Sequence, residues 1–318
     1  MKYLFFDIEC AVVNKTVAKI CAFGYCLTDE QFHILEKEDV LINPQGNFHL
    51  TDRKGSQGLV LPYKYEEFKK YPTFPAVAPK IYALLQDKDT VVAGHATMND
   101  VKYLNLESKR FSLPALHYRF ADTQFLYMNK VGEFSRQFGL GAIAQDLGVE
   151  FTPHRAVDDA YATMKIAEAM CKAENVDFLG LLAKYQVTMG ETKDGETVQN
   201  TSVGYEKHLE MVAKRKEERE KNRADFARFF DREKRKRAKD GKLKGKTVCF
   251  SHSLVCDAEK AKELLSLAFT NGAFYTFRAE ECSLYVCIDG ETGARMQSVS
   301  ARGGRVMTVE EFLEYVTI

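Results

Sequence analysis

Two carboxylates near the start of the chain have the type and spacing to do chemistry. Asp7 and Glu9 follow the apolar stretch Tyr3–Phe6. Residues i and i+2 of a β-strand face the same side, so both carboxylates would share one face. Two carboxylates at the end of an apolar strand are costly unless something neutralises them, and hard divalent cations bind oxygen ligands. The pair therefore indicates metal binding, although short acidic pairs also occur at strand ends without a metal.

Two further groups of residues have the same kind of ambiguity. Asp100 follows His95 and falls near the start of an expected helix, where a carboxylate also interacts favourably with the helix dipole. His154 precedes another expected helix, whose early turn carries Asp158 and Asp159. Taken alone, these are a surface histidine and a charged helix start. Only the combination with the first group favours chemistry.

The elements that must position these groups follow from the pattern of apolar residues. Short alternating or continuous apolar runs predict strands, and longer runs of helical period predict helices. The expected strands cover 3–6, 19–27, 32–42 and 90–93. The expected helices cover 75–85, 99–110, 122–129, 139–147 and 157–172, and a glycine- and proline-containing loop is expected over 43–62. Strand hairpins followed by alternating helices and strands predict a mixed sheet flanked by helices.

Taken together, the three groups resemble the DEDDh family of 3′→5′ exonucleases, whose proofreading members accompany replicative DNA polymerases. The family pattern has three blocks, which appear here in order as Asp7-x-Glu9, His95-x4-Asp100-x3-Leu104 and His154-x4-Asp159. The resemblance covers about residues 1–172. It implies an α/β, RNase H-like fold with a mixed five-stranded sheet, and a role in DNA replication or repair. Asp122-Thr123 also resembles a recurring family pair, which we interpret as structural.

The resemblance also implies a mechanism. Phosphodiester hydrolysis would use two Mg²⁺ ions roughly 3.5–4 Å apart, with Mn²⁺ able to substitute. Asp7 would bridge both ions, and Glu9 and Asp159 would hold the ion that activates water. Asp100 would help to bind the second ion. His154 would be the general base, a role that suits an imidazole of unperturbed pKa near 6.5.

Three residues are expected to contact substrate near the scissile end: Cys10, His95 and Asn99. Cys10 stands where many family members have Thr, and Ala96 and Asn99 stand where Asn and Phe are often found. These departures bear on substrate preference rather than on the metal ligands. DNA is the favoured substrate and RNA is possible. The partner would be single-stranded or 3′-ended nucleic acid.

Charge is balanced overall but not along the chain. Lys plus Arg and Asp plus Glu both number 45. The stretch Tyr205–Lys246 holds 17 Lys and Arg against nine Asp and Glu, and no Pro or Gly interrupts it before Gly241. We predict a long charged helix there. It is either a solvated spacer or a basic arm that binds phosphates, chiefly through Lys234, Arg235, Lys236 and Arg237.

The last residues, from about Gly245, resemble a BRCT domain. The resemblance is carried by Gly245–Ser251, Asn271–Ala273, Leu284–Cys287 and Arg305–Leu313. It implies a module that binds proteins, phosphopeptides or DNA ends. Ser251 and Arg295 occupy places similar to phosphate-binding residues of that family. His252 replaces the usual glycine, so a structural or protein-contact module is the other interpretation.

These features predict an exonuclease domain over 1–184, a polar linker and charged helix over 185–245, and a BRCT-like domain over 246–318. Within the linker, Thr188–Gly204 is expected to be flexible. Eight cysteines without zinc-ligand spacing indicate free thiols. No stretch approaches the roughly 18 apolar residues of a membrane span, and no signal-peptide core is present, so a cytoplasmic location is expected.

Two other classes of function compete with a nuclease. A phosphate-loop kinase or synthetase is excluded because no GxxxxGK[ST] motif is present. The remaining alternative is a non-catalytic nucleic-acid or protein adaptor that keeps an exonuclease fold. The complete set of four carboxylates and His154 argues against it, because an inactive scaffold would not need clustered carboxylates.

Overall fold

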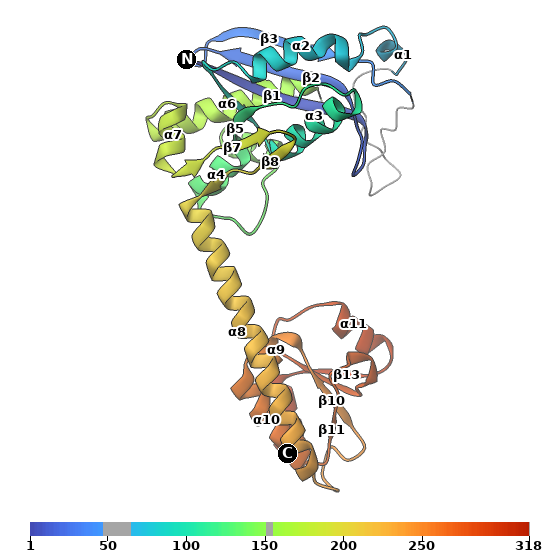
Figure 1. Ribbon diagram of the computed structural model, residues 1–318. Coiled ribbons are helices and arrows are strands. Elements are labelled where there is room, and N and C mark those ends of the chain that lie inside the picture. Colours follow the sequence, from blue (N-terminus) through green and yellow to red (C-terminus); the bar gives the residue numbers. More distant parts are fainter. Residues whose placement is uncertain (47–64, 151–154, 318) are drawn as a thin grey trace. The chain divides into compact units, whose positions relative to one another are not determined.

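The computed structural model describes residues 1–46, 65–150 and 155–317 (Figure 1). The chain divides into two compact units, Met1–His208 and Leu209–Ile318. Most of the loop expected over 43–62 lies outside the described residues, and so does His154. No helix within the described ranges is both long enough and apolar enough to cross a membrane.

A large mixed sheet forms the centre of the first unit. Its described strands lie in the order β3-β2-β1-β4-β5-β7-β8. β1 is antiparallel to β2 and parallel to β4. The strands are β1 Lys2–Val13, β2 Ala18–Thr28, β3 Ile34–Leu41, β4 Thr90–Gly94, β5 Tyr118–Asp122, β7 Gly190–Lys193 and β8 Glu196–Val198.

Helices cover both faces of this sheet because β1 is apolar on both sides (Figure 1). Leu4 and Phe6 pack with α2 (Phe74–Leu85) and α3 (Met98–Arg110). Tyr3 and Phe5 point the other way and share a core with four helices. These are α4 Thr123–Val131, α5 Leu140–Asp146, α6 Ala156–Glu174 and α7 Phe178–Lys184; the short α1 spans Tyr65–Phe68.

The predicted fold class is confirmed, with one extension of the sheet. Seven strands replace the five expected, because Thr188–Gly204 is not a flexible linker. It contributes β7 and β8 to the main sheet, and β9 (Thr201–Ser202) pairs with β6 (Val187–Thr188). Gly190 allows this close packing, since a Cβ there would lie 2.5 Å from the Phe120 ring. Asn105 on α3 also donates hydrogen bonds to Thr192 and Thr197.

The second unit is built on a parallel sheet in the order β11-β10-β12-β13. Alternate residues of each strand face opposite sides: Val248 and Phe250 join one core cluster, and Cys249 joins another with Val299. The elements are β10 Thr247–Phe250, α9 His252–Cys256, α10 Ala258–Thr270, β11 Phe274–Tyr275, η2 Ala279–Glu281, β12 Leu284–Cys287, α11 Ala294–Ala301, β13 Arg305–Thr308 and α12 Val309–Thr317.

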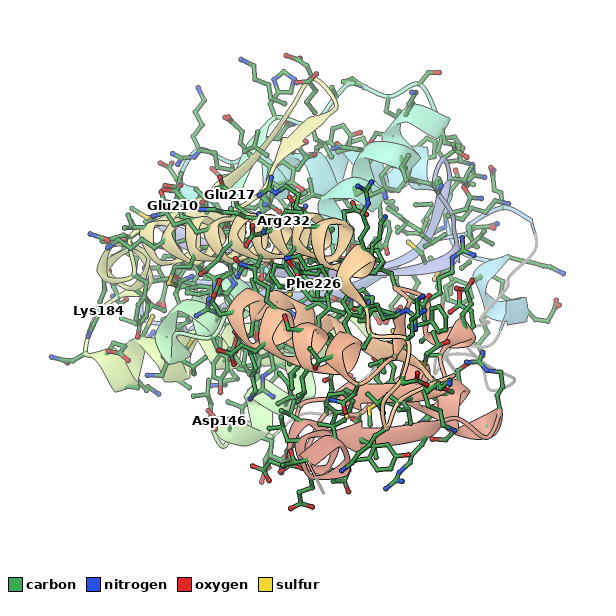
Figure 2. All side chains as sticks on the ribbon, turned by 90° about the horizontal axis from the view of Figure 1, so that it is seen from below. Asp146, Lys184, Glu210, Glu217, Phe226 and Arg232 are labelled. Carbon is green, nitrogen blue, oxygen red and sulfur yellow. The ribbon has the colours of Figure 1, made fainter. Side chains whose placement is uncertain are left out.

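The long helix predicted from the charged stretch is α8, Val203–Glu233, followed by the 3₁₀ turn η1, Lys234–Lys236. Its C-terminal part belongs to the core of the second unit, because Phe226 is fully buried there. Figure 2 shows Phe226 on the side of α8 that faces α10, and Glu217 on the opposite side. Every residue of 209–221 is exposed.

Candidate functional site

The end of β1 presents two carboxylates on one face. Asp7 and Glu9 continue the row of Tyr3 and Phe5, as the two-residue period requires. The pairing of β1 with β2 shifts directly after Glu9, which lies opposite Ala22. Such bulges re-aim side chains and are frequent beside active sites.

A glycine brings the third carboxylate to this place. Gly24 of β2 lies opposite Asp7 on one side and opposite Asp39 of β3 on the other. A Cβ on Gly24 would lie 2.0 Å from the main-chain carbon of Ala156. The start of α6 therefore lies directly on the sheet at this point. Its first turn carries Asp159, where the helix dipole favours a negative charge.

Asp7, Glu9 and Asp159 form a compact acidic group. Each offers a carboxylate oxygen, and these oxygens all lie within 4.8 Å of one another. Asp158 is held elsewhere: its carboxylate lies 3.7 Å from Lys37 Nζ and 3.9 Å from a guanidinium nitrogen of Arg155. The geometry therefore separates the two neighbouring aspartates of α6, and it places Asp159 with the pair from β1.

Asp100 lies in the same cavity but outside this compact group. It is in the first turn of α3 and is only 5% exposed. Burial, followed by the charges of Asp122 and Glu9, raises the pKa of its carboxyl well above the usual range. The cavity has a volume of about 310 Å³, and it is lined by Asp7, Glu9, Asp100 and the three residues expected to contact substrate, Cys10, His95 and Asn99.

The carboxylates repel one another in a poorly solvated place. Burial raises the pKa of Asp7 well above its usual range, and Asp100, Glu9 and Asp159 raise it further. Burial, followed by the charges of Asp159 and Asp39, raises the pKa of Glu9 to about 7. Desolvation and like charges both disfavour the ionised form. A bound cation would remove this cost, so the group is suited to hold one.

Asp39 is a fifth carboxylate at the site that sequence reasoning missed. Its side chain is 10% exposed and lies 3.5 Å from Arg155. Its charge raises the pKa of both Asp7 and Glu9. No motif marks it, because Asp39 sits in the strand sequence Ile34–Leu41, which is mostly exposed and charged. Only the register that sets it opposite Gly24 would have indicated its position.

His95 lines the cavity, but both of its ring nitrogens already have partners. Nδ1 lies 3.1 Å from Thr123 Oγ1, and Nε2 lies 3.1 Å from the carbonyl oxygen of Phe138. A carbonyl oxygen can only accept, so Nε2 carries the proton. Burial lowers the pKa of His95 to about 4, which keeps the ring neutral near pH 7. The ring thus fixes the loop before α5 against the site.

Thr123 belongs to the pair interpreted as structural, and Asp122 accepts from four main-chain N–H groups: Ala96, Thr97, Gln124 and Phe125.

The basic residues after α8 are not equivalent. Lys234 and Lys236 form ion pairs with Asp231 and Glu233, at 2.6 and 2.7 Å. Arg237 donates to the carbonyl oxygen of Gly272 at 3.0 Å, and its guanidinium lies 3.9 Å from the centre of the Phe274 ring. Arg237 therefore fixes the end of this segment to the second unit. Lys234, Arg235 and Lys236 are exposed.

The two residues expected to bind phosphate in the second unit lie in different surroundings. Ser251 is fully buried, and its hydroxyl accepts from the N–H of Leu254 at the start of α9. Arg295 lines a cavity of about 340 Å³ together with Arg223 and His252. Ser251 does not line that cavity, so the structure does not bring the pair together there.

Comparison with known proteins agrees with this geometry. The family model described as "Exonuclease" matches residues 4–167, about half of the chain. The chain belongs to this exonuclease family. All the described carboxylates of the site fall within the matched residues. Members of the family are hydrolases that act on nucleic acids, and they normally use divalent metal ions. No curated protein matches the chain.

Solved structures share the exonuclease fold. A 3′-exonuclease described as recognising the 3′ end of a histone mRNA stem-loop matches with a TM-score of 0.50 and 17% identity, over 64% of this chain and 71% of that one. A full-length 3′-exonuclease matches with a TM-score of 0.51 and 17% identity, over 64% of this chain and 91% of that one. The nuclease domain of 3′hExo, described as a DEDDh family member bound to rAMP, matches with a TM-score of 0.47 and 19% identity, over 54% of this chain and 92% of that one.

Proposed function

We propose that this chain is a metal-dependent 3′→5′ exonuclease that hydrolyses phosphodiester bonds at the 3′ ends of nucleic acids. One observation carries the proposal. Asp7, Glu9 and Asp159, from segments far apart in the sequence, place their carboxylate oxygens within 4.8 Å of one another in an exonuclease-family chain. The spacing of the three DEDDh blocks supports the direction of hydrolysis.

The donor set fits Mg²⁺, with Mn²⁺ as a substitute. Carboxylate oxygens are the ligands that Mg²⁺ prefers, and the pKa values of Asp7 and Glu9 are raised in the absence of a cation. In our proposal Asp7, Glu9 and Asp159 hold the metal ions, with Asp100 completing the set. Two divalent ions would activate water and neutralise the charge that develops on the phosphate.

His154 is proposed as the general base that takes the proton of the attacking water. It lies outside the described residues, so the assignment rests on its spacing, five residues before Asp159. His95 is a poor alternative, since Thr123 and Phe138 occupy both of its ring nitrogens. Replacing His154 by Ala should reduce the rate about 10²–10⁴-fold while metal binding is retained.

DNA is proposed as the favoured substrate, and RNA remains within the proposal. One of the structures that share the fold is described as recognising the 3′ end of an mRNA stem-loop. Cys10 and Asn99, which line the acidic cavity, are neutral and give no charge-based preference between the two. A cytoplasmic location and a part in DNA replication or repair stay predictions.

The test uses matched DNA and RNA oligonucleotides that carry a label at the 5′ end. The full chain should shorten them from the 3′ end with Mg²⁺ or Mn²⁺, and a chelator should abolish the reaction. Asp159→Asn should abolish it too. Asp158→Asn is the matched control, because Asp158 lies beside Lys37 and Arg155 rather than in the acidic group. Full activity in chelator, or in Asp159→Asn, would refute the mechanism.

The second unit is proposed to be a BRCT-like module that binds a protein partner or a DNA end, on the strength of its sequence resemblance. The cavity lined by Arg295, Arg223 and His252 offers positive charge for such a ligand.

The alternative function, a non-catalytic adaptor, predicts that the full chain binds nucleic acid but leaves it intact in Mg²⁺. The oligonucleotide assay separates the two.

A further inference from the structure

A second cavity of about 310 Å³ lies beside the acidic one in the first unit. The two cavities share Ala96 and Asn99, which belong to the turn between β4 and α3 and to the start of α3. Among the described residues that line the second cavity, no carboxylate is present apart from Asp122, whose oxygens accept main-chain N–H groups. It therefore adjoins the proposed place of hydrolysis, but its chemistry is different.

Aromatic rings form one wall of the second cavity. Phe125 comes from α4, Phe134 from the loop before α5, and Tyr205 from the first turn of α8. The Tyr205 ring lies 5.4 Å from that of Phe125 and 5.8 Å from that of Phe134, between ring centres. All three side chains are half-buried. Half-buried aromatic faces are the surfaces on which unpaired nucleobases stack.

Asn200 lines the same cavity and carries a buried, unused hydrogen-bonding group. It is 5% exposed, and neither the nitrogen nor the oxygen of its side-chain amide has a hydrogen-bond partner among the described residues. Leaving a buried polar group unpaired is destabilising, so such a group points to a missing partner. An amide offers a donor and an acceptor side by side, which matches the edge of a nucleobase, adenine above all.

The walls of the cavity are held in place by hydrogen bonds. The carbonyl oxygen of Phe138 accepts from Gln124 Nε2 at 2.8 Å and from His95 Nε2 at 3.1 Å. Ser202 Oγ donates to Asn129 at 2.6 Å and accepts from the N–H of Tyr205. The cavity is thus preformed. His95 donates one of the hydrogen bonds that support the second cavity, and it also lines the acidic cavity.

One positively charged side chain, that of Arg136, belongs to a residue that lines the second cavity. Arg136 is exposed, and its guanidinium lies 4.6 Å from the centre of the Phe138 ring. A guanidinium can pair with a phosphate through parallel hydrogen bonds. The second cavity therefore combines a stacking wall, an unpaired amide and a positive charge. Base, edge and phosphate of a nucleotide each have a complementary group.

We propose that this cavity binds a nucleobase of the substrate strand, on the 5′ side of the nucleotide that is removed, and that the Asn200 amide reads its edge. The inference rests on the proposed exonuclease function, because that function places the 3′ end of the strand at the acidic cavity. Asn200 and Tyr205 lie beyond residues 4–167, the part of the chain that the family model matches.

The test measures binding, so that it does not depend on hydrolysis. Fluorescence anisotropy with the full chain in chelator would use eight-nucleotide strands of DNA and of RNA. In each series a single abasic residue moves stepwise from the 3′ end. The loss of one stacked and hydrogen-bonded base should weaken binding about tenfold at one position, one to three nucleotides from the 3′ end. Adenine at that position should bind most tightly.

Three variants assign the effect to the cavity. Asn200→Leu removes the amide at similar volume, and it should abolish the preference for adenine. Phe134→Ala, in the surface loop, should reduce the abasic effect at the same position. Gln145→Leu is the matched control: it removes an exposed amide on α5 that lines neither cavity, and it should keep the wild-type profile.

The outcomes separate this inference from the function on which it rests. A flat abasic profile in the wild type, or an unchanged adenine preference in Asn200→Leu, would overturn the subsite. A positional profile in a chain that fails to shorten strands in Mg²⁺ would support the subsite and refute the exonuclease proposal.

Discussion

Glu9 lies where burial and two neighbouring carboxylates oppose its ionisation. Its pKa is raised to about 7, from a usual value of 4.5. Between these values the native chain binds more protons than the unfolded chain, so the free energy of unfolding falls as the pH rises. The decrease in the free energy of unfolding is complete once the pH exceeds the pKa of Glu9 in the native state. At one pKa unit per about 1.4 kcal/mol, Glu9 destabilises the metal-free fold by up to about 3 kcal/mol.

This predicts that Glu9→Gln stabilises the protein when a chelator is present. Thermal unfolding should show a higher Tm for the variant at pH 8, and the difference should vanish below about pH 4, where Glu9 is protonated in both states. The exposed Glu191→Gln, on β7, is the control and should change little. A difference that is independent of pH would mean that the charge of Glu9 does not destabilise the fold.

The spacing of a recognised pattern predicts a site of four carboxylates, and the structure brings the oxygens of three of them, Asp7, Glu9 and Asp159, within 4.8 Å of one another. No comparable signal marks Asp39 or Asn200. Asp39 reaches the site through strand register. Asn200 lies in the polar segment between β8 and β9, and no apolar pattern there signals its burial. Chemistry that depends on a motif is visible in a sequence, whereas chemistry that depends on packing is not.

At the scale of elements, one glycine lets α6 reach the sheet. We predict that Gly24→Ala abolishes the stabilisation of the fold by Mg²⁺, because a Cβ 2.0 Å from the main chain of Ala156 must displace the helix start that carries Asp159. Overpacking of this kind also costs about 1–3 kcal/mol. Gly293→Ala is the control, since nothing lies within 4 Å of its Cβ position.

The measurement is the rise in Tm on adding Mg²⁺, which reports binding to the native state without reference to activity. Wild type and Gly293→Ala should show the same rise, and Gly24→Ala should show almost none. An undiminished rise in Gly24→Ala would mean that Asp159 does not contribute to metal binding.

Helices and strands with periodic apolar residues can be predicted from the sequence, and so can the uninterrupted charged helix α8, whereas the short polar strands β7 and β8 cannot. Most of the strands and helices expected in the first unit lie within two residues of their predicted bounds. However, β1 extends to Val13 where the sequence predicts an end at Phe6, and neither β5 nor α7 is predicted. The sequence predicts a linker where β7 and β8 form a hairpin, because the residues there are those typical of turns: Gly190, Thr192, Asp194, Gly195 and Thr197. The hairpin of β7 and β8 is held by backbone pairing of β7 with β5 and by a hydrogen bond from Asn105 to Thr192. Both contacts join residues that are far apart in the sequence.

At the scale of the whole molecule, the first unit ends at His208 rather than near Lys184. A fragment of residues 1–208 should fold and retain the rate of hydrolysis on short oligonucleotides. A fragment of 1–184 should be less stable, because it lacks β7 and β8 and exposes the edge of β5. Denaturant unfolding of both fragments measures this difference. Equal midpoints would show that the hairpin adds no stability.

The charged stretch makes a separate prediction about long substrates. Phosphate contacts release counterions, so the affinity falls steeply with salt. Replacing Lys234, Arg235 and Lys236 together by Ala should lower the slope of log K against log salt by about two for single strands. Arg237 is left unchanged because it bonds to Gly272. Filter binding of both proteins between about 50 and 200 mM salt is the measurement, and equal slopes would identify a spacer.

The middle of α8 has a consequence for handling the protein. Residues 209–221 are all exposed, so no core holds this stretch, and isolated helical turns are marginally stable in water. Local opening there needs little free energy, and the stretch is rich in the lysines and arginines that trypsin cleaves. Brief digestion should therefore nick the chain first within residues 209–221, at the start of the second unit, and separate the first unit from the packed part of the second. Proteolysis in this exposed part of α8 thus provides a way to prepare the first unit and the packed part of the second unit for separate study.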